Sequence, residues 1–189
     1  MTDLLKYITS KVTLTEDELI AVELAFKSES YAKGQLLIKP DSRSSKVFFI
    51  EKGLIRTFYH KDDKDITQFF FDEGTFTAPL SSIFYDKSEP YGWEALEDSV
   101  VRVIRYEELE PMLLKMPTLQ QMFFYVSIDM LNVFAIKLES IQFQTAEQRY
   151  NTMMEMYPKI LLRAPLGQIA SYLGITQQTL SVIRAKRQA

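Results

Sequence analysis

The chain has 189 residues, of which 47% are hydrophobic, enough for a packed core and too many for an intrinsically disordered chain. No cysteine is present, which excludes disulfides, thiol nucleophiles, zinc–thiolate sites and cysteine-bound iron–sulfur clusters. The formal net charge of −3 is unevenly distributed, because residues 137–189 hold seven basic and three acidic residues while the rest holds 15 and 22. A basic end on an acidic body indicates a surface that attracts phosphate, although an ordinary basic helix would give the same charge.

The N-terminus and the apolar runs bear on localisation. The first 20 residues carry acidic side chains among their apolar positions, which is not the pattern of a signal peptide. The apolar runs Phe69–Phe71 and Met122–Val126 are far shorter than the ~20 residues that a membrane span needs. We therefore expect a soluble cytoplasmic protein without a membrane partner.

The first part of the chain, to about Met112, is predicted to be rich in short strands. A helix is expected around Leu19–Phe26, with Thr15 and Glu18 placed to form a capping box. Runs of Val, Ile, Phe and Tyr then alternate with turn residues, at Gln35–Lys39, Val47–Glu51, Leu54–His60, Thr67–Phe71 and Val100–Tyr106. Many short strands with regular turns predict a sandwich or jelly roll rather than a parallel sheet.

A long helix is predicted after Pro117, and it carries two apolar stripes. The first stripe is Leu119, Met122, Phe123, Val126, Met130, Val133 and Ile136. The second is Phe124, Tyr125, Ile128, Leu131, Phe134, Ala135 and Leu138. A surface helix needs only one such stripe, so two stripes predict two partners, the strand domain and a second copy of the chain. We assign the dimer contact to the first stripe, through Leu119, Met122, Phe123, Val126, Met130 and Val133. A helix buried inside one monomer is the alternative.

Residues 166–184 have the pattern of a helix-turn-helix. Ala170 supplies the small residue where two helices cross, and Gly174 supplies the left-handed turn four residues later. Thr176 is a natural N-cap for the second helix. Inward-facing positions hold apolar residues, namely Ile169, Leu173, Ile175, Leu180 and Ile183.

The outward face of the second predicted helix is polar and free of acids. No Asp or Glu occurs from Lys159 to the end, and a helix in the major groove needs amides, hydroxyls and guanidinium groups. We predict that DNA is contacted by Thr176, Gln177, Gln178, Ser181, Arg184, Lys186 and Arg187. An amphipathic helix pair that docks on a partner protein, without binding DNA, is the alternative.

Taken in order, these segments resemble the Crp/Fnr family of bacterial transcription regulators over nearly the whole chain. The resemblance is carried by residues 47–56 (VFFIEKGLIR), 71–76 (FDEGTF), 145–150 (TAEQRY) and 169–176 (IASYLGIT), the last most similar to members from the Bacteroidetes. It implies an α+β protein with a cyclic-nucleotide-binding-like β-roll at residues 1–112, a dimerisation helix at 113–143 and a helix-turn-helix domain at 144–189. It also implies a homodimer that binds a near-palindromic site in double-stranded DNA and works with RNA polymerase.

The chain departs from the family at the ligand site. Cyclic-AMP receptors of this family use a Gly–Glu pair and an Arg–Ser pair, which fall here at Ala78 and Pro79 and near Pro90 and Tyr91. A cyclic phosphate needs a cationic or N–H-rich cradle, and proline and tyrosine supply no charge. We therefore expect no cofactor and no binding of cyclic AMP. Any effector pocket is predicted at Phe76, Ala78, Pro79, Leu80, Pro90, Tyr91 and Trp93.

A second departure concerns the end of the chain. Only Gln188 and Ala189 follow Arg187, so the β-hairpin wing of many relatives is expected to be absent. Contacts to the DNA backbone would then come from the basic residues of the domain, including Lys159 and Arg163.

Enzyme activity is not expected. His60 is the only histidine, so the chain cannot supply the two or three histidines of a metal-dependent double-stranded β-helix enzyme, and we predict no metal site. A Gly-rich phosphate loop is also missing. His60 is interpreted as a surface residue at a strand end rather than a haem ligand.

Overall fold

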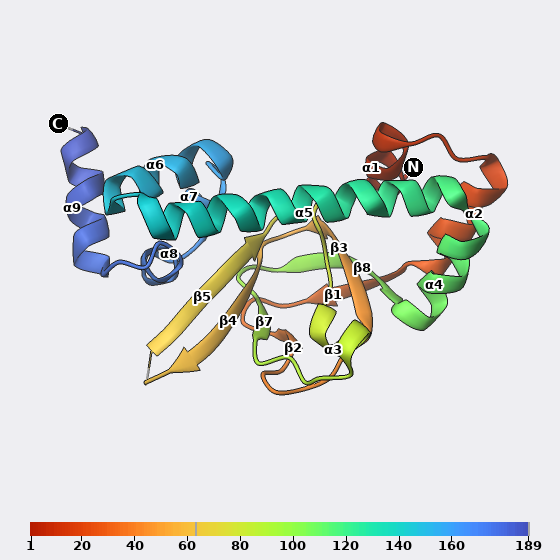
Figure 1. Ribbon diagram of the computed structural model, residues 1–189, viewed down its shortest axis with the longest axis horizontal. Coiled ribbons are helices and arrows are strands. Elements are labelled where there is room, and N and C mark those ends of the chain that lie inside the picture. The colour runs from red at the N-terminus through yellow and green to blue at the C-terminus, as the bar shows by residue number, and fades with distance from the viewer. Residues whose placement is uncertain (63, 189) are drawn as a thin grey trace.

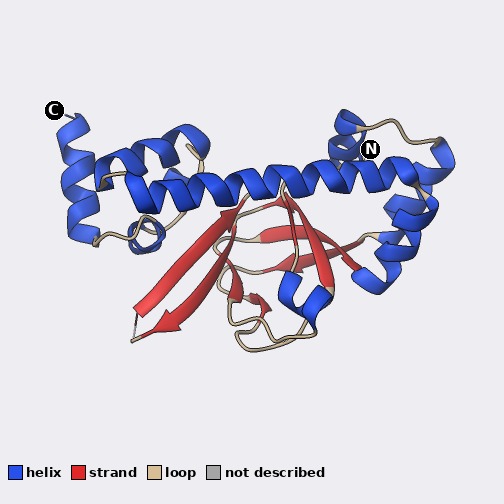
Figure 2. Cartoon of the chain, in the orientation of Figure 1, coloured by secondary structure: helices blue, strands red, loops and turns tan. Residues whose placement is uncertain are grey.

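The computed structural model describes residues 1–62 and 64–188, without the side chains of residues 187 and 188. A long helix, α5 (Pro117–Phe143), runs along two β-sheets, with small helices gathered at each of its ends (Figures 1 and 2). Strands, one long helix and C-terminal helices follow one another as predicted, so the predicted α+β fold with a β-roll is confirmed.

The β-roll consists of two four-stranded sheets in which every strand pair is antiparallel. The first sheet has the order β1 (Lys27–Tyr31), β8 (Ser99–Arg105), β3 (Lys46–Lys52) and β6 (Phe76–Thr77). The second has the order β2 (Leu36–Ile38), β7 (Gly92–Ala95), β4 (Ile55–Lys61) and β5 (Lys64–Phe71). The short strands β1, β6 and β7 were not predicted, because they lack a distinct apolar alternation.

Side chains of the two sheets form a common core. Phe48 and Ile50 of β3 point toward the second sheet, and the ring centroid of Phe48 lies 5.5 Å from that of Trp93 on β7. Phe49, between them in sequence, points to the opposite face, where its ring centroid lies 4.8 Å from that of Phe76. Both faces of β3 are therefore covered, which explains its uninterrupted apolar run.

Helices cover the outer face of the first sheet. They are α1 (Asp3–Lys11), α2 (Glu16–Ala25), α4 (Tyr106–Lys115) and the first half of α5, and together with β3 and β6 they enclose a second core. Thr15 and Glu18 form the predicted capping box at the start of α2. A shorter helix, α3 (Leu80–Tyr85), lies in the loop between β6 and β7.

One part of the assignment on α5 is wrong. Leu119 and Met122, predicted to contact a second copy, are fully buried within the protomer against the N-terminal helices. Phe123 and Val126 pack against the same core. The second stripe is the one left exposed, with Phe124 and Leu131 each 60% exposed and Leu138 56% exposed.

The C-terminal domain is entirely helical. It comprises α6 (Ala146–Met156), α7 (Ile160–Arg163), α8 (Leu166–Tyr172) and α9 (Gln177–Gln188). Pro158 and Pro165 lie between helices, where proline cannot interrupt hydrogen bonds inside a helix. The core of this domain also takes in Leu54, Phe70 and Leu96 from the β-roll, so the domain is docked on the sheet that contains β5.

Candidate functional site

Helices α8 and α9 pack as a helix-turn-helix. Gly174 adopts a left-handed conformation with φ +66° in the turn between them, as its position predicted. Ala170 is buried at the crossing, and its carbonyl accepts a hydrogen bond from the Ile175 N–H at 3.0 Å. Of the five predicted inward positions, Ile169, Leu173, Leu180 and Ile183 are buried and Ile175 is half-buried. Sequence spacing alone thus located the turn and both helices.

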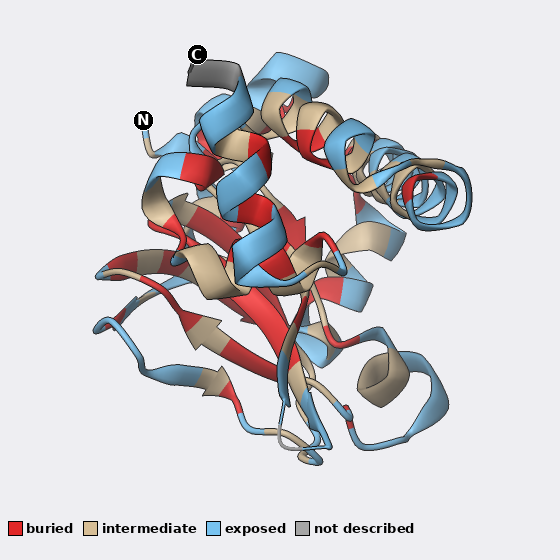
Figure 3. Ribbon diagram, turned by 90° about the vertical axis from the view of Figure 1, so that its left-hand side faces the viewer, coloured by how far each residue is buried: buried red, intermediate tan, exposed pale blue. Residues whose placement is uncertain are grey.

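Helix α9 has one exposed side and one buried side (Figure 3), and most of the exposed residues are polar, with Val182 as an apolar exception. Gln177, Gln178, Ser181 and Lys186 are exposed, and Arg184 is half-buried. Thr176 acts as the predicted N-cap, because its Oγ1 accepts a hydrogen bond from the Thr179 N–H at 3.1 Å. Of the predicted DNA contacts, Arg187 has a side chain outside the described residues.

Gly167 is a residue of this surface that sequence reasoning missed. A β-carbon at this position would lie 2.6 Å from Nε2 of Gln177. The missing side chain therefore leaves room for Gln177 to lie against the start of α8. A glycine near a helix N-terminus gives no sign of this by itself, because the contact is made across the turn.

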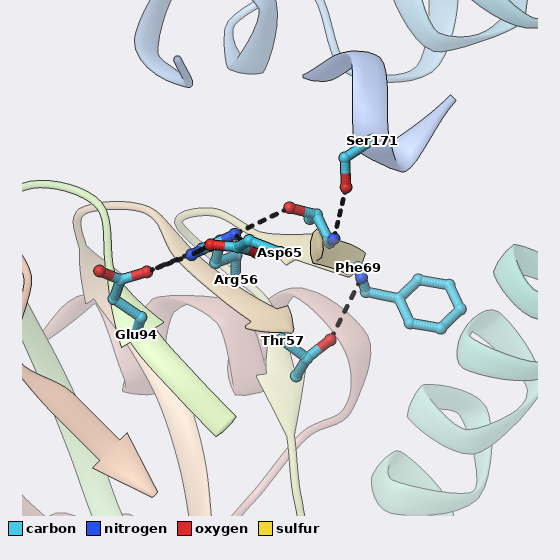
Figure 4. A network of polar contacts seen from close by, with 7 residues as sticks. Arg56, Thr57, Asp65, Phe69, Glu94 and Ser171 are labelled. Atoms are coloured by element: carbon cyan, nitrogen blue, oxygen red, sulfur yellow. Dashed lines mark hydrogen bonds and ion pairs between the residues drawn. The ribbon is translucent and has the colours of Figure 1, made fainter. Parts of the chain in front are cut away.

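Two contacts join the helix-turn-helix to its neighbours. The backbone N–H of Thr67 on β5 donates a hydrogen bond of 2.6 Å to Oγ of Ser171 on α8 (Figure 4). On the other side, Nζ of Lys137 on α5 donates to the carbonyl of Tyr172 and lies 3.2 Å from the centroid of the Tyr172 ring. The helix-turn-helix is therefore held between the β-roll and α5.

Arg163 makes a third contact between the domains and corrects a prediction. Its guanidinium donates to both carboxylate oxygens of Glu73 at 2.8 Å and to Glu97 at 2.5 and 3.2 Å. Both acids lie in turns of the β-roll. In this arrangement Arg163 is bound to two carboxylates and does not offer a phosphate contact, whereas Lys159 is exposed.

The strands under α8 are ordered by Arg56, which is buried on β4. Its guanidinium contacts both carboxylate oxygens of Asp65 at 2.6 Å, Glu94 at 2.8 Å and the hydroxyl of Thr67 at 3.0 Å (Figure 4). Thr67 is the residue whose N–H reaches Ser171, so the network extends from β7 to α8. Arg56 is consequently occupied by carboxylates of its own sheet.

Lys137 has an unusual electrostatic environment. Burial, and then the neighbouring Arg149, lower the pKa of the Lys137 ammonium to about 7. Tyr172 beside it is also buried, which raises the pKa of its hydroxyl. Among the described residues no carboxylate lies within ion-pair distance of Lys137 or Arg149.

A pocket of about 190 Å³ opens between the second sheet, α3 and α5. Four of the predicted effector residues line it, Ala78, Leu80, Tyr91 and Trp93. The other three do not: Phe76 packs in the core beneath the N-terminal helices, Pro79 is buried at the start of α3, and Pro90 is exposed. Residues that were not predicted complete the wall, namely Thr57, Gln68, Phe69, Phe71, Thr77, Ser81, Glu89, Met130 and Phe134.

The β-roll matches a known family. Residues 28–115 fit the family model described as the cyclic nucleotide-binding domain. Among curated proteins no match to the chain is found.

Solved structures extend the similarity beyond this domain. FixK2 from Bradyrhizobium japonicum is 18% identical with a TM-score of 0.74, over 85% of this chain and 83% of its own. The c-di-GMP-responsive global regulator CLP from Xanthomonas campestris is 12% identical with a TM-score of 0.71, over 92% of both chains. A CooA variant from Carboxydothermus hydrogenoformans is 19% identical with a TM-score of 0.69, over 94% and 86%. The chain has the Crp/Fnr-type fold, and the predicted resemblance is confirmed.

Within the cyclic nucleotide-binding domain, the charge of the pocket differs from what a cyclic phosphate requires. Neither Lys nor Arg is among the described residues that line it, and the buried residue Glu89 does line it. A carboxylate repels an anion instead of cradling it. Among the described residues, no group of three or more His, Asp or Glu side chains is placed to hold a metal ion, and His60 is exposed at the end of β4.

Proposed function

We propose that the chain is a cytoplasmic, homodimeric regulator of transcription that recognises a near-palindromic site in double-stranded DNA, and not an enzyme. The observation that carries this proposal is the outer face of α9. Gln177, Gln178 and Ser181 are exposed on the first two turns of α9, the second helix of the helix-turn-helix. Amides and hydroxyls in these positions are the groups that contact base edges in the major groove.

Basic residues supply the other half of a DNA interface. Lys186 and Arg184 lie on the last turns of α9, and Lys159 is exposed before α7. Since no Asp or Glu occurs between residues 159 and 189, nothing in this stretch repels a phosphate backbone. Phosphate contacts would position the domain, and the first turns of α9 would give specificity.

The exposed stripe of α5 supports dimerisation. Phe124, Ile128, Leu131, Ala135 and Leu138 recur at alternating intervals of four and three residues, which is the spacing of a two-stranded coiled coil. All five are exposed in the single chain. A second copy of α5 would cover them and would place two helix-turn-helix domains on one DNA duplex.

By length and composition alone, α5 is also apolar enough to cross a membrane, with a mean hydropathy of 1.3. Its contacts support a different role. Leu119 and Met122 are fully buried in the protomer, and the Phe134 ring centroid lies 4.9 Å from that of Phe69 on β5. Asp129 forms an ion pair of 3.5 Å with Lys11. A helix that spans a membrane would have to break all of these contacts, so we place α5 in a dimer with no membrane partner.

The domain at residues 28–115 would act as a sensor that does not use cyclic AMP, because its pocket lacks a cationic side chain among the described residues. RNA polymerase is the expected partner on DNA, as for a regulator of this fold.

A gel-shift titration with random-sequence DNA tests DNA binding directly. The affinity should fall steeply as salt rises, since each neutralised phosphate releases counterions. A helix pair that docks only on proteins would leave the DNA unshifted at every salt concentration. That result would contradict the proposed function.

A further inference from the structure

The pocket beside α3 is walled by aromatic rings. Phe71 and Trp93 stack with ring centroids 6.0 Å apart, and Phe69 lies 4.9 Å from Phe134 of α5. Tyr91 lines the pocket as well and is fixed by an edge contact with Tyr59 at 5.7 Å. The faces of such rings carry negative electrostatic potential, which attracts cations.

Glu89 adds a formal negative charge to this wall. It is 5% exposed, and its Oε1 accepts one hydrogen bond of 3.1 Å from the N–H of Ser82 on α3. Its backbone is fixed on both sides, by bonds of 2.8 Å to the carbonyl of Ser42 and 2.7 Å from the N–H of Asp41. The carboxylate of Glu89, a residue of the pocket lining, therefore has a defined position.

No cation of the protein neutralises Glu89 among the described residues. It takes part in no ion pair of 4.0 Å or less, and the lining contains no Lys, Arg or His. Arg56, on β4, is bound by Asp65 and Glu94 instead. A carboxylate buried without a cationic partner carries a desolvation cost, and a cation supplied from outside would offset that cost.

We propose that this pocket binds a small organic cation, an amine or quaternary ammonium compound, with its charged group held between Glu89 and the aromatic rings. A volume of about 190 Å³ suits a compact ligand, since a cavity of about 150 Å³ accepts benzene. Aromatic rings around a cationic nitrogen are a known means of recognising choline-like groups. The ligand class is opposite in charge to a cyclic nucleotide.

The pocket is placed to communicate with the rest of the chain. Phe69 on β5 lines it, and Thr67 on the same strand donates to Ser171 of the helix-turn-helix. Met130 and Phe134 of α5 line it too, next to the exposed stripe of that helix. A bound cation would thus contact both elements that position α9. This regulatory consequence rests on the proposed function, whereas binding of the cation rests on the pocket alone.

Titration calorimetry of the full chain without DNA tests the binding. The probes are tetramethylammonium, choline and phenethylamine, with the uncharged carbon isostere of choline and cyclic AMP as controls. At least one cation should bind, and the uncharged isostere should bind about tenfold more weakly or worse, since a charge-assisted contact is lost. If none of the three cations binds at millimolar concentration, or if the isostere binds equally well, the inference is wrong.

Two variants locate the effect. Glu89→Gln keeps an oxygen that accepts from the Ser82 N–H but removes the charge, so it should abolish the preference for the cation while keeping the melting temperature. If this variant does not fold, Tyr91→Leu provides the test. Loss of one ring should weaken binding of the cation by about threefold and leave binding of the isostere unchanged. Equal losses for both ligands would contradict the inference. The gel shift of the wild-type chain with DNA is measured separately, so failure of cation binding and failure of DNA binding are distinguishable.

Discussion

Under the proposed function, we expect base recognition to depend most on Gln178. It is exposed on the first turn of α9, and a glutamine amide pairs with adenine through two hydrogen bonds that contribute about 1–3 kcal/mol of discrimination. Replacing it by Ala should relax preference at one base pair in each half-site and leave the salt dependence unchanged. Competition gel shifts with single-base variants of the site measure this.

Lys186 provides the matched control on the same helix. It is exposed near the end of α9, where a phosphate is the expected contact. Lys186→Ala should weaken binding to all DNA sequences alike, and it should lower the slope of log affinity against log salt concentration by about one unit. If Gln178→Ala gave the same uniform loss with an unchanged base preference, its assignment to base recognition would be wrong.

Lys137 should make stability rise with pH. Below pH 7 its ammonium is charged in both states, so the cost of burying it is fully present. Above its folded pKa of about 7 the native state releases the proton while the unfolded state, with its pKa near 10.5, keeps it. The unfolded state then binds more protons, so the free energy of unfolding rises from about pH 7 toward 10.5, by up to about 1.4 kcal/mol for each pH unit.

Urea unfolding at a series of pH values checks this. The Lys137→Met variant should lose the rise in the free energy of unfolding, and the control Lys64→Met, at an exposed position, should keep it. The groups around Lys137 are Arg149, Tyr157 and Tyr172. Both tyrosines have raised pKa values, so they stay neutral in the native state over this range and act in the opposite direction only above about pH 10. A flat wild-type profile would contradict the buried position of Lys137.

Residues whose role is local could be predicted from the sequence, and those whose role depends on a distant partner could not. Gly174 and Thr176 are set by the turn that they form, and both occupy their predicted places. Arg163 was predicted to contact phosphate. In the structure it binds Glu73 and Glu97, which lie 90 and 66 residues away in sequence. Glu89 gave no signal, since nothing in its neighbours shows that it is buried.

At the scale of elements, the exposed stripe of α5 should hold the dimer. Leu131 lies at the middle of the stripe and is 60% exposed in the single chain. Leu131→Asp places a charge where each copy would bury an apolar side chain worth roughly 1.5–3 kcal/mol, so the variant should be monomeric in light scattering. Leu114→Asp introduces the same charge at a position on α4 that is 75% exposed, outside the stripe, and should remain dimeric. A dimer of Leu131→Asp would exclude this interface.

The two apolar stripes of α5 could be predicted from the sequence, but their partners could not. Periodicity identified both stripes, but the choice between them depends on α1, which was not predicted and which packs with Leu119 and Met122. Leu4, Leu5 and Ile8 form one apolar face of α1, but nothing in the sequence shows which stripe of α5 that face contacts. Once α1 is in place, the first stripe faces inward and the second remains free.

Arg163 should act as a clamp between α7 and the β-roll. Burial alone would raise the pKa of Glu73, but hydrogen bonds from Arg163 and the Gly53 N–H outweigh it and lower the pKa to about 2. A carboxylate with a lowered pKa contributes stability above its unfolded value, near 4.5, and this contribution is lost as pH falls toward 2. The clamp is therefore complete at neutral pH.

Glu73→Gln combined with Glu97→Gln should release the clamp. Amide exchange should then become faster in α7 and α8, where the domain is docked, and stay unchanged in β3 and β8. Glu16→Gln with Asp17→Asn, on the exposed first turn of α2, removes the same charge elsewhere and should change neither region. Unchanged exchange in α7 and α8 of the clamp variant would show that these ion pairs do not hold the domain.

At the scale of the whole molecule, one strand and one helix connect every functional part. The pocket, the contact to α8 and the exposed stripe all involve β5 or α5. The order of domains was visible in the sequence, because strands, a long helix and a helix-turn-helix have distinct patterns. Docking of the C-terminal domain on β5 was not, because nothing in the sequence around Leu54, Phe70 and Leu96 shows that they share a core with α6–α9.

Selection of binding sites from random DNA by the full chain is the strongest test of a dimer that recognises DNA through α9. A dimer with one helix-turn-helix in each copy should enrich two inverted half-sites whose centres lie about one helical turn, or roughly 10 base pairs, apart. Leu131→Asp should lose the paired half-sites, and Gln178→Ala should change one position in each. Recovery of no common sequence, or of a single half-site by the wild-type chain, would contradict a dimer that recognises DNA through α9.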